Sequence, residues 1–362
     1  APVFLTEPQS TRGVKGSFRL ADNDVLKWGV LVDGKPALSN DAITIKGNNV
    51  ELADMYATES LVCYSASNPE LSKEFVLTVV PDGLFEGAGT EASPYLIKTY
   101  DLKTLADEVN DNGNTFEGAY FRQTADIVCE PDFKGIATDG VATHVFAGIY
   151  DGDGHSIDNF RVDAVKYDTD GKAVQSGSMQ YVALFGRANA TAIIRNLTLG
   201  AGSSVKAWAY VGGIVGILDG KIENCVNLAE VSSIANMCGG VVGNLTKNGS
   251  AVNCYNAGKI NGGGMTTGGI VGNCYALVKG CQNDGTVTGA PTNSFCKELA
   301  QSNVGGVAGN VNSTGIIESC LNTGTISGAA SVGGIAGALS NATVNGCVST
   351  GVAIALKEGG SF

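Results

Sequence analysis

The chain has 362 residues, of which 16% are charged, and its formal net charge is -12. Residues 81–180 carry 18 of the 35 acidic side chains, which excludes nucleic acid and anionic membranes as expected partners, because both need clustered Lys and Arg. No run reaches the roughly 20 apolar residues of a membrane span, and the sequence begins at Ala1 without a signal-peptide core. We therefore expect an exported protein in processed or truncated form.

Residues 1–80 form the first predicted domain. Short β-rich runs, such as residues 25–32 and 74–80, alternate with Gly- and Asn-containing turns. Six or seven such strands in 80 residues are typical of a small Ig-like β-sandwich, and Trp28 is predicted to be an aromatic residue of its core. The boundary is expected at Pro81-Asp82-Gly83.

Residues 81–180 are predicted to hold a capping helix and the first irregular coils of the second domain. The apolar residues with the i, i+3, i+4, i+7 spacing of one helix face are Leu102, Leu105, Ala106 and Val109. Asn112-Gly113 is a stop signal for this helix. A lone amphipathic helix directly before a repeat array is well placed to cover the array's first, unpaired edge.

Residues 181–362 repeat with a period of about 28 residues. One block, Gly-Gly followed by two apolar residues and Gly, ends at Gly216, Gly243, Gly272, Gly309 and Gly337. A second block centres on Cys225, Cys254, Cys281, Cys320 and Cys347. Two residues later stand Asn227, Asn256, Asn283, Asn322 and finally Ser349. A third block, Gly-x-apolar, begins at Gly258, Gly285 and Gly324.

Three short β-type blocks per period, with turns and no helices between them, predict a parallel β-helix with three strands per coil. The handedness rule for parallel connections favours a right-handed coil. The fold class is therefore all-β: an Ig-like sandwich, then a helix-capped right-handed parallel β-helix of about eight coils. Equivalent residues of successive coils stack at about 4.8 Å, so each repeated position becomes a ladder.

These ladders have a predicted chemistry. The residues before the cysteines, and before Leu197 in the equivalent place of a weaker first copy, tolerate a left-handed turn: Asn196, Asn224, Asn253, Gly280, Ser319 and Gly346. The stacked asparagines are expected to pass amide hydrogen bonds from coil to coil. We interpret the stacked cysteines as buried free thiols and not as a metal strip or a disulfide chain, because no coil has a His or second Cys at ligand spacing.

The repeat resembles the GLUG motif, V-G-G-I-[VA]-G followed by I-x-N-C-x-N-x-G-x-[VI]. This motif is found in bacterial surface proteins and adhesins, including non-catalytic parts of IgA-cleaving metallopeptidases. The lead-in from Gly89 to Ile157 is similar to the segment that precedes such repeats in exported Bacteroidetes proteins. The resemblance covers about residues 87–355, and it departs from the pattern at the insertion 290–301 and at Ser349. It implies a surface location and supplies no catalytic residue.

Several enzyme classes lose their main support. The only histidines are His144 and His155, and the sequence has no H-E-x-x-H, no G-x-S-x-G and no Gly-Lys followed by Ser or Thr. A β-helix polysaccharide lyase or glycoside hydrolase remains an alternative, for which Asp219, Glu223 and Glu230 are the only close acidic group in the repeats. We expect no catalytic residue.

Two short acidic loops are the weak candidates for calcium ligands: Asp151 with Asp153, and Asp168 with Asp170. The alternative is a Gly-rich turn entering the first coil and a solvated loop, because neither stretch has the further acidic residue of an EF-type loop. We therefore expect no resident metal and no other cofactor.

For ligand binding, the residue between the Cys and the Asn of each coil is predicted to face outward: Val226, Tyr255, Gln282, Leu321 and Val348. Trp208, Tyr210 and Tyr275 are expected to add aromatic surface, so the candidate binding residues are Trp208, Tyr210, Tyr255, Tyr275 and Leu321. The alternative is scattered surface hydrophobics beneath covering loops.

The predicted function is a non-enzymatic cell-surface adhesin or ligand-binding protein that engages a glycan or a host or matrix protein. The alternative is a passive stalk or spacer. The expected location is the cell surface, as an outer-membrane lipoprotein or a secreted protein, and a lipid or surface anchor upstream of residue 1 is left open.

Overall fold

The computed structural model describes residues 16–20, 25–53, 57–68, 71–79, 83–170, 173–174, 180–289 and 302–355. The chain divides into two compact units, Ala1–Ala88 and Gly89–Phe362, a few residues after the predicted boundary. The insertion 290–301 lies outside the described residues. Among the residues that are described, no helix has the length and apolarity to cross a membrane.

The first unit has two antiparallel sheets that share one core. One sheet has the order β1 (Ser17–Arg19), β5 (Asn49–Leu52), β4 (Ile43–Lys46). The other has the order β3 (Lys35–Ala37), β2 (Leu26–Val32), β6 (Ala57–Ser65), β7 (Ser72–Val79). Val30, Ile43 and Leu61 bring both sheets into one buried cluster, and Trp28 packs against it as predicted. The two-sheet core agrees with a sandwich, and its Ig-like topology stays a prediction.

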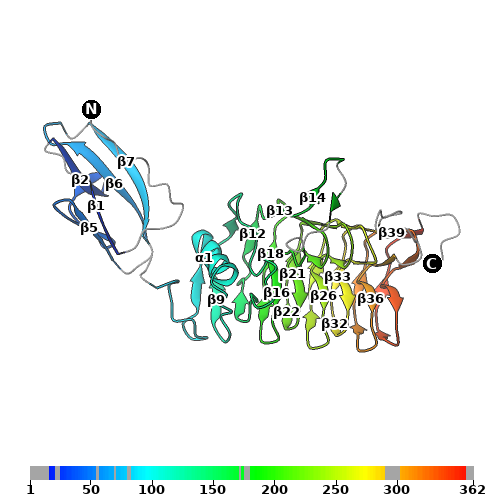
Figure 1. Cartoon of the computed structure of the whole chain (residues 1–362). Coiled ribbons are helices and arrows are strands. Elements are labelled where there is room, and N and C mark those ends of the chain that lie inside the picture. The colour runs from blue at the N-terminus through cyan, green and yellow to red at the C-terminus, as the bar shows by residue number, and fades with distance from the viewer. Residues whose placement is uncertain are drawn as a thin grey trace. The chain divides into compact units, whose positions relative to one another are not determined.

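The second unit begins with β8 (Tyr95–Ile97) and α1 (Thr99–Asn110). The Lys98 backbone N–H donates to Asp101 Oδ2 at 3.0 Å, which satisfies a free amide at the helix start. All four residues of the predicted apolar face are buried. Gly113 follows in the left-handed conformation with φ 67°. Figure 1 shows α1 at the N-terminal end of the coils, as the predicted cap.

The rest of the unit is a parallel β-solenoid of five stacked sheets, each named here after its strand in the coil Val211–Ser233 (Figure 1). The β20 sheet contains β20 (Val211–Gly212), β25 (Cys238–Gly239), β30 (Thr266–Gly268), β35 (Asn303–Gly305) and β40 (Ser331–Gly333). The β21 sheet contains β16 (Phe185–Ala188), β21 (Val215–Leu218), β26 (Val242–Leu245), β31 (Val271–Cys274), β36 (Ala308–Val311) and β41 (Ala336–Leu339).

The β22 sheet contains β8, β9 (Tyr120–Gln123), β11 (Ile149–Asp151), β17 (Ile193–Arg195), β22 (Lys221–Glu223), β27 (Ser250–Val252), β32 (Leu277–Lys279), β37 (Ile316–Glu318) and β42 (Thr343–Asn345). The β23 sheet contains β10 (Ile127–Val128), β12 (Ser156–Asp158), β18 (Thr198–Leu199), β23 (Val226–Asn227), β28 (Tyr255–Asn256), β33 (Gln282–Asn283), β38 (Leu321–Asn322) and β43 (Val348–Ser349).

The β24 sheet contains β13 (Arg161–Asp163), β19 (Ser204–Ala207), β24 (Glu230–Ser233), β29 (Ile260–Gly262), β34 (Val287–Gly289), β39 (Ile326–Gly328) and β44 (Ala353–Ala355). A separate antiparallel hairpin of β14 (Lys166–Tyr167) and β15 (Ala173–Val174) projects from the coils (Figure 1). The eight strands of the β23 sheet agree with the predicted eight coils, and the hand of the coil stays a prediction.

The prediction of three strands per coil is wrong, because a complete coil has five. Two of the three sequence blocks contain a corner and are each divided into two strands. The first block divides at Gly213, where an added Cβ would lie 2.4 Å from Asn227 Oδ1 and from Gly240 O. The second divides at Asn224, which has φ 53°. A repeated block in the sequence therefore marks an apolar segment, but it does not show whether the segment contains a bend that divides it into two strands.

The predicted ladders are confirmed. The five residues before the cysteines, and Asn196 before Leu197 in the equivalent place of an earlier coil, all have positive φ, between 53° and 63°. Four asparagines are fully buried, and the amides donate in series from Asn227 to Asn256 at 2.8 Å, from Asn256 to Asn283 at 2.7 Å, from Asn283 to Asn322 at 2.8 Å and from Asn322 to Ser349 Oγ at 3.1 Å. Four of the five stacked cysteines are buried, Cys347 is half-buried, and all five are free thiols.

Candidate functional site

The outer face of the β23 sheet carries the predicted row between the cysteines and the asparagines. Strand pairing places Val226 beside Tyr255, then Gln282, Leu321 and Val348 in successive coils. Each side chain alternates with a buried ladder residue, so it must point outward. The first four are half-buried and Val348 is 54% exposed. The outward orientation predicted for Tyr255 and Leu321 is confirmed.

Asp284 fixes the central part of this row. Its Oδ2 accepts the Tyr255 hydroxyl at 2.8 Å and its Oδ1 accepts the Thr323 hydroxyl at 2.5 Å. The Gln282 amide donates to both oxygens, at 2.8 and 3.0 Å. Partial burial opposes ionisation, but the hydrogen bonds from Thr323, Gln282 and Tyr255 outweigh it and hold the Asp284 pKa below its usual range. The carboxylate is therefore charged at neutral pH.

This network gives the row the chemistry of a pre-organised contact surface. The Tyr255 ring is tethered through its hydroxyl to the next coil, so little rotamer freedom is left to lose when a ligand packs on it. A planar amide, a carboxylate and a hydroxyl lie beside the ring, and these groups donate to and accept from ligand hydroxyls or amides. The row combines one fixed aromatic face with polar groups at the spacing of the coils.

The structure contradicts the prediction for Trp208. The side chain is 4% exposed and packs with Ala209 and Ala235 in a buried cluster. Trp208 and Ala209 follow β19 at a corner, where two consecutive side chains are both buried and strand alternation no longer applies. Trp208 is therefore a core residue and offers no surface to a ligand.

The other two predicted tyrosines lie elsewhere. Tyr210 is half-buried, and its ring stacks on Tyr181 with ring centroids 4.9 Å apart. The Arg187 guanidinium lies 3.9 Å from the Tyr181 ring centroid, so the stack already has its own cation. Tyr275 is 38% exposed and follows β31 of the β21 sheet. These residues do not belong to the outward row on the β23 sheet, which is called the Tyr255 row below and consists of Val226, Tyr255, Gln282, Leu321 and Val348.

The calcium candidates occupy two separate places. Asp151 ends β11, and its Oδ2 accepts Arg195 Nε at 2.8 Å while its Oδ1 accepts the Asn196 amide at 2.9 Å. Asp153 lies in the adjacent turn, and its backbone N–H donates to Asp151. Within the described part of the chain, no three His, Cys, Asp or Glu side chains are grouped so that they could hold a metal ion.

Asp168 and Asp170 lie in the connection that follows β14. The Asp170 backbone N–H donates to Asp168 Oδ1 at 3.0 Å, the hydrogen bond of an Asx turn. This pair therefore has a local structural role in the hairpin turn.

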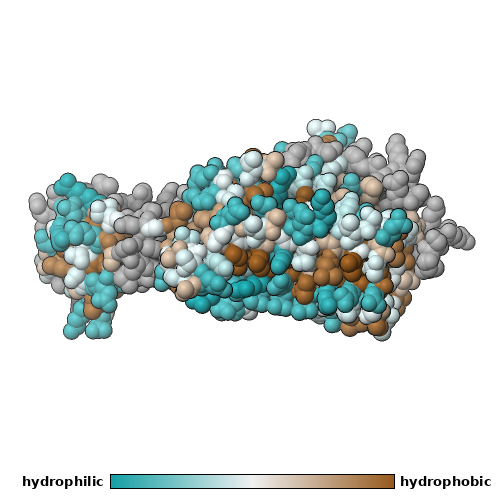
Figure 2. All heavy atoms as spheres, turned by 90° about the horizontal axis from the view of Figure 1, so that it is seen from below, coloured by the Kyte–Doolittle hydropathy of each residue, from teal (hydrophilic) through white to brown (hydrophobic). Residues whose placement is uncertain are grey.

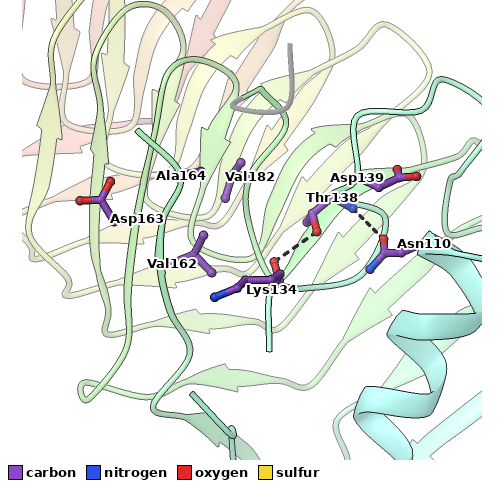
Figure 3. A pocket seen from close by; sticks show the side chains of 8 residues that line it. All are labelled: Asn110, Lys134, Thr138, Asp139, Val162, Asp163, Ala164 and Val182. Carbon is purple, nitrogen blue, oxygen red and sulfur yellow. Dashed lines mark hydrogen bonds between the residues drawn. The ribbon is translucent and has the colours of Figure 1, made fainter. Parts of the chain in front are cut away.

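Two cavities beside the β24 sheet were not anticipated from the sequence. One has a volume of about 390 Å³ and lies at the edge strand β13, between this strand, the end of α1 and residues 134–139 (Figure 3). Its lining residues are Asn110, Lys134, Thr138, Asp139, Val162, Asp163, Ala164 and Val182. The second, of about 420 Å³, shares Val162 and Asp163 and continues over β19 and β24. Its other lining residues are Arg161, Ser204, Val205, Lys206, Glu230 and Ser232.

Local hydrogen bonds give the first cavity a defined wall. The Asn110 amide donates to Gly135 O at 2.9 Å. Figure 3 shows the second bond of this side chain, in which Asn110 Oδ1 accepts the Thr138 backbone N–H at 3.0 Å. His144 Nδ1 lies 2.5 Å from Asp139 Oδ2. A weak sequence signal for these cavities existed in the alternation of polar and apolar residues in Arg161-Val162-Asp163, but it did not show which coils lie side by side.

Apolar side chains also gather in patches between hydrophilic ones on the face of the solenoid seen in Figure 2. Exposed large apolar residues of the last coils include Leu339, Val344 and Val348, each at least 37% exposed. Leu339 lines another cavity, of about 340 Å³, with residues of β40 and β41, and Val348 is the last member of the outward row on the β23 sheet.

No protein-family model matches the sequence. A stretch of 176 residues is 29% identical to "Halomucin" of Haloquadratum walsbyi, which covers 46% of this chain and 2% of that protein. The chain thus spans a very small part of the curated relative. A crystal structure of a "putative immunoglobulin A1 protease" from Bacteroides ovatus is similar over 76% of this chain and 81% of that chain, with a TM-score of 0.56 and 22% sequence identity. This likeness supports the β-solenoid fold.

Proposed function

We propose that the chain is a non-enzymatic surface protein that binds a glycan or a host or matrix protein through the outer face of its solenoid. The observation that carries the proposal is the hydrogen-bond network of the Tyr255 row. In this network the neighbouring Asp284 holds Tyr255, Gln282 and Thr323 in fixed positions. A half-buried, outward-facing row fixed in this way is suited to recognition, because little side-chain entropy is lost on binding.

The comparisons support the location. The similarity to a protein named halomucin favours a surface or secreted protein. The GLUG-like repeats favour the same location, as an outer-membrane lipoprotein or a secreted chain. The solenoid fold is shared with a protein named as a protease, but this chain's histidines, His144 and His155, face carboxylates of Asp139 and Asp126 and lie outside the row. We propose a binding role for the row and no chemical step.

The test is a binding screen of the full chain on glycan and matrix-protein arrays, followed by titration of each ligand found. Tyr255→Ala should weaken binding about fivefold, because an aromatic contact contributes about 1 kcal/mol. The matched control is Tyr120→Ala, which removes another half-buried tyrosine, on β9 of the β22 sheet.

The outcomes of these experiments distinguish a ligand-binding protein from a passive spacer and from an enzyme. Saturable binding that is lost with Tyr255 and retained without Tyr120 supports the proposal. No specific ligand on either array would favour the passive spacer, for which the continuous asparagine ladder supplies rigidity. Mass spectrometry of the ligand after prolonged incubation tests the non-enzymatic part, since cleavage by the pure chain would overturn it.

A further inference from the structure

The two cavities on the β24 sheet form a second surface with chemistry of its own. They meet at Val162 and Asp163 and extend together over β13, β19 and β24, three successive coils of the solenoid. We propose that they form one groove that binds an uncharged linear oligosaccharide along the solenoid axis. This site is separate from the Tyr255 row, which lies on the β23 sheet.

Polar side chains line the groove in two rows. Strand pairing places Arg161 beside Ser204 and Ser204 beside Glu230. Two residues further along each strand it places Asp163 beside Lys206 and Lys206 beside Ser232. Neighbouring strands are about 4.8 Å apart, close to the length of one sugar unit in an extended chain. Each unit of such a chain therefore meets two polar side chains of one coil.

The charges of the lining balance. Three lining residues are cationic, Lys134, Arg161 and Lys206, and three are anionic, Asp139, Asp163 and Glu230. Most are already paired within the protein: Lys206 with Asp163 at 3.2 Å, Lys259 with Glu230 at 3.9 Å, and His144 with Asp139 at 2.5 Å. A charged polymer gains no net attraction from this lining. Hydroxyl groups suit it, because each one both donates and accepts a hydrogen bond.

An aromatic ring stands at the rim. Tyr167 of β14 is 49% exposed, and its hydroxyl lies 2.7 Å from Lys206 Nζ. The same ammonium lies 5.3 Å from the Tyr167 ring centroid, so Lys206 holds the ring from the groove side. The hydrogen bond with Tyr167 raises the Lys206 pKa, which keeps this cation charged. A ring fixed beside a polar groove is a stacking surface for the apolar face of a sugar.

A peptide ligand fits this surface less well. Extended peptides add to the free edge of a sheet, where backbone groups are unpaired. Here β19 and β24, which line most of the second cavity, are paired on both sides, so this part of the groove presents a sheet face whose side chains meet the ligand. β13 is the edge strand of the sheet, and Lys134 and Thr138 line the first cavity beside it. Recognition must then come from side-chain hydrogen bonds and ring stacking, which are the interactions that sugars make.

The test is isothermal titration calorimetry of the full chain with linear glucose, mannose and xylose oligomers of one to six units. Uronic-acid and amino-sugar oligomers of the same lengths serve as charged probes. We expect an uncharged series to bind, with affinity that rises to about three units, one for each coil. We also expect this affinity to change little with salt, because an uncharged ligand is not screened.

Ser204→Trp fills the groove from β19, the middle one of its three strands, and should lower the affinity at least tenfold. Ser250→Trp is the matched control on the outer face of β27, and it should leave binding unchanged. Circular dichroism and thermal melting verify that each variant is folded. The proposal is overturned if no uncharged series binds, if a charged series binds more tightly with steep salt dependence, or if Ser204→Trp binds like the parent chain. Because Tyr255 lies outside the groove, failure here is distinguishable from failure of the proposed function.

Discussion

At the scale of single residues, the solenoid gives each of its four fully buried ladder asparagines a partner in the next coil. The Asn283 amide donates to Asn322 Oδ1 at 2.8 Å and to Gly285 O at 3.0 Å, and it accepts from Asn256. Each fully buried amide is thereby satisfied on two sides. A second row of this kind lies on the β21 sheet and consists of buried Asn273 between half-buried Asn244 and Asn310. The Asn that follows Gly in each of those coils was its sequence signal.

Asn283→Ala should therefore be costly. It leaves a carbonyl oxygen of Asn322 without its donor and a small cavity in the core, and we expect a loss of about 2 to 4 kcal/mol in the free energy of unfolding. Asn261→Ala, at an outward position of β29, should cost less than about 1 kcal/mol. Urea denaturation followed by circular dichroism measures both, and equal losses would show that the ladder adds nothing beyond a surface hydrogen bond.

The buried thiols predict a loss of stability at alkaline pH. Burial raises the pKa of Cys225, Cys238 and Cys274 from the ordinary value of 9.0 to about 12. The unfolded chain releases these protons first, so the stability present below pH 9 falls as the pH rises from 9 to 12. Each thiol contributes about 1.4 kcal/mol per pH unit in that window. Cys225→Ala should make the unfolding free energy fall less steeply between pH 9 and 12, by about 1.4 kcal/mol per pH unit. An unchanged slope would contradict a buried thiol with a raised pKa at Cys225.

At the scale of elements, the corners decide how many strands a coil has. The corner between the β22 and β23 sheets is a left-handed residue in six successive coils, and four of those residues are not glycine. Asn224 donates to Asn196 Oδ1 at 3.2 Å, so neighbouring corners can also bond to each other. The residue type tolerated there is set by φ, because a β-branched side chain is strained in this conformation.

Gly280 offers a direct test of the corner, since its φ is 63°. Gly280→Asn should be tolerated, because Asn occupies the same corner in three other coils and can bond to Asn253. Gly280→Val should be less stable than Gly280→Asn by about 1 to 2 kcal/mol. Thermal or urea unfolding of the pair measures the difference. Equal stability would mean that the corner does not require the left-handed conformation.

The sequence period predicted the contacts that recur in every coil, and it did not predict the bends within the repeated blocks. The ladders of Cys225 and Asn227 were predictable, because the same contact is repeated in each coil and leaves a regular trace in the sequence. The division of each coil into five strands was not, because bends at Gly213 and Asn224 lie inside single hydrophobic blocks. Trp208 was misplaced for the same reason, since alternation fails at a corner.

At the scale of the whole molecule, the solenoid is a one-dimensional stack in which each coil contacts only its neighbours. The outward row at Tyr255 was predictable, because it alternates with the repeated asparagines. The groove on the β24 sheet was not, because Lys134 and Arg161 come from irregular coils whose stacking order has no repeat in the sequence. Binding surfaces that combine repeated and irregular coils therefore need the structure.

The first coil of the stack depends on its helical cap. Leu105 of α1 is fully buried, and Leu105→Asp places a carboxylate in that apolar contact. We expect a loss of about 4 kcal/mol or more, or unfolding of the first coils. Glu108→Ala, on the half-buried side of the same helix, should cost less than about 1 kcal/mol. Hydrogen exchange would show the loss of protection at β9 and β11 first, and unchanged protection there would mean that α1 is not the cap.

Ligand binding by the outward side chains of the solenoid can be seen in a structure of the chain with the ligand selected on the arrays. We expect ligand atoms packed on the Tyr255 ring and within hydrogen-bond distance of Gln282 or Asp284. A ligand seated wholly on the first unit, with the Tyr255 row left in contact with solvent, would contradict this expectation.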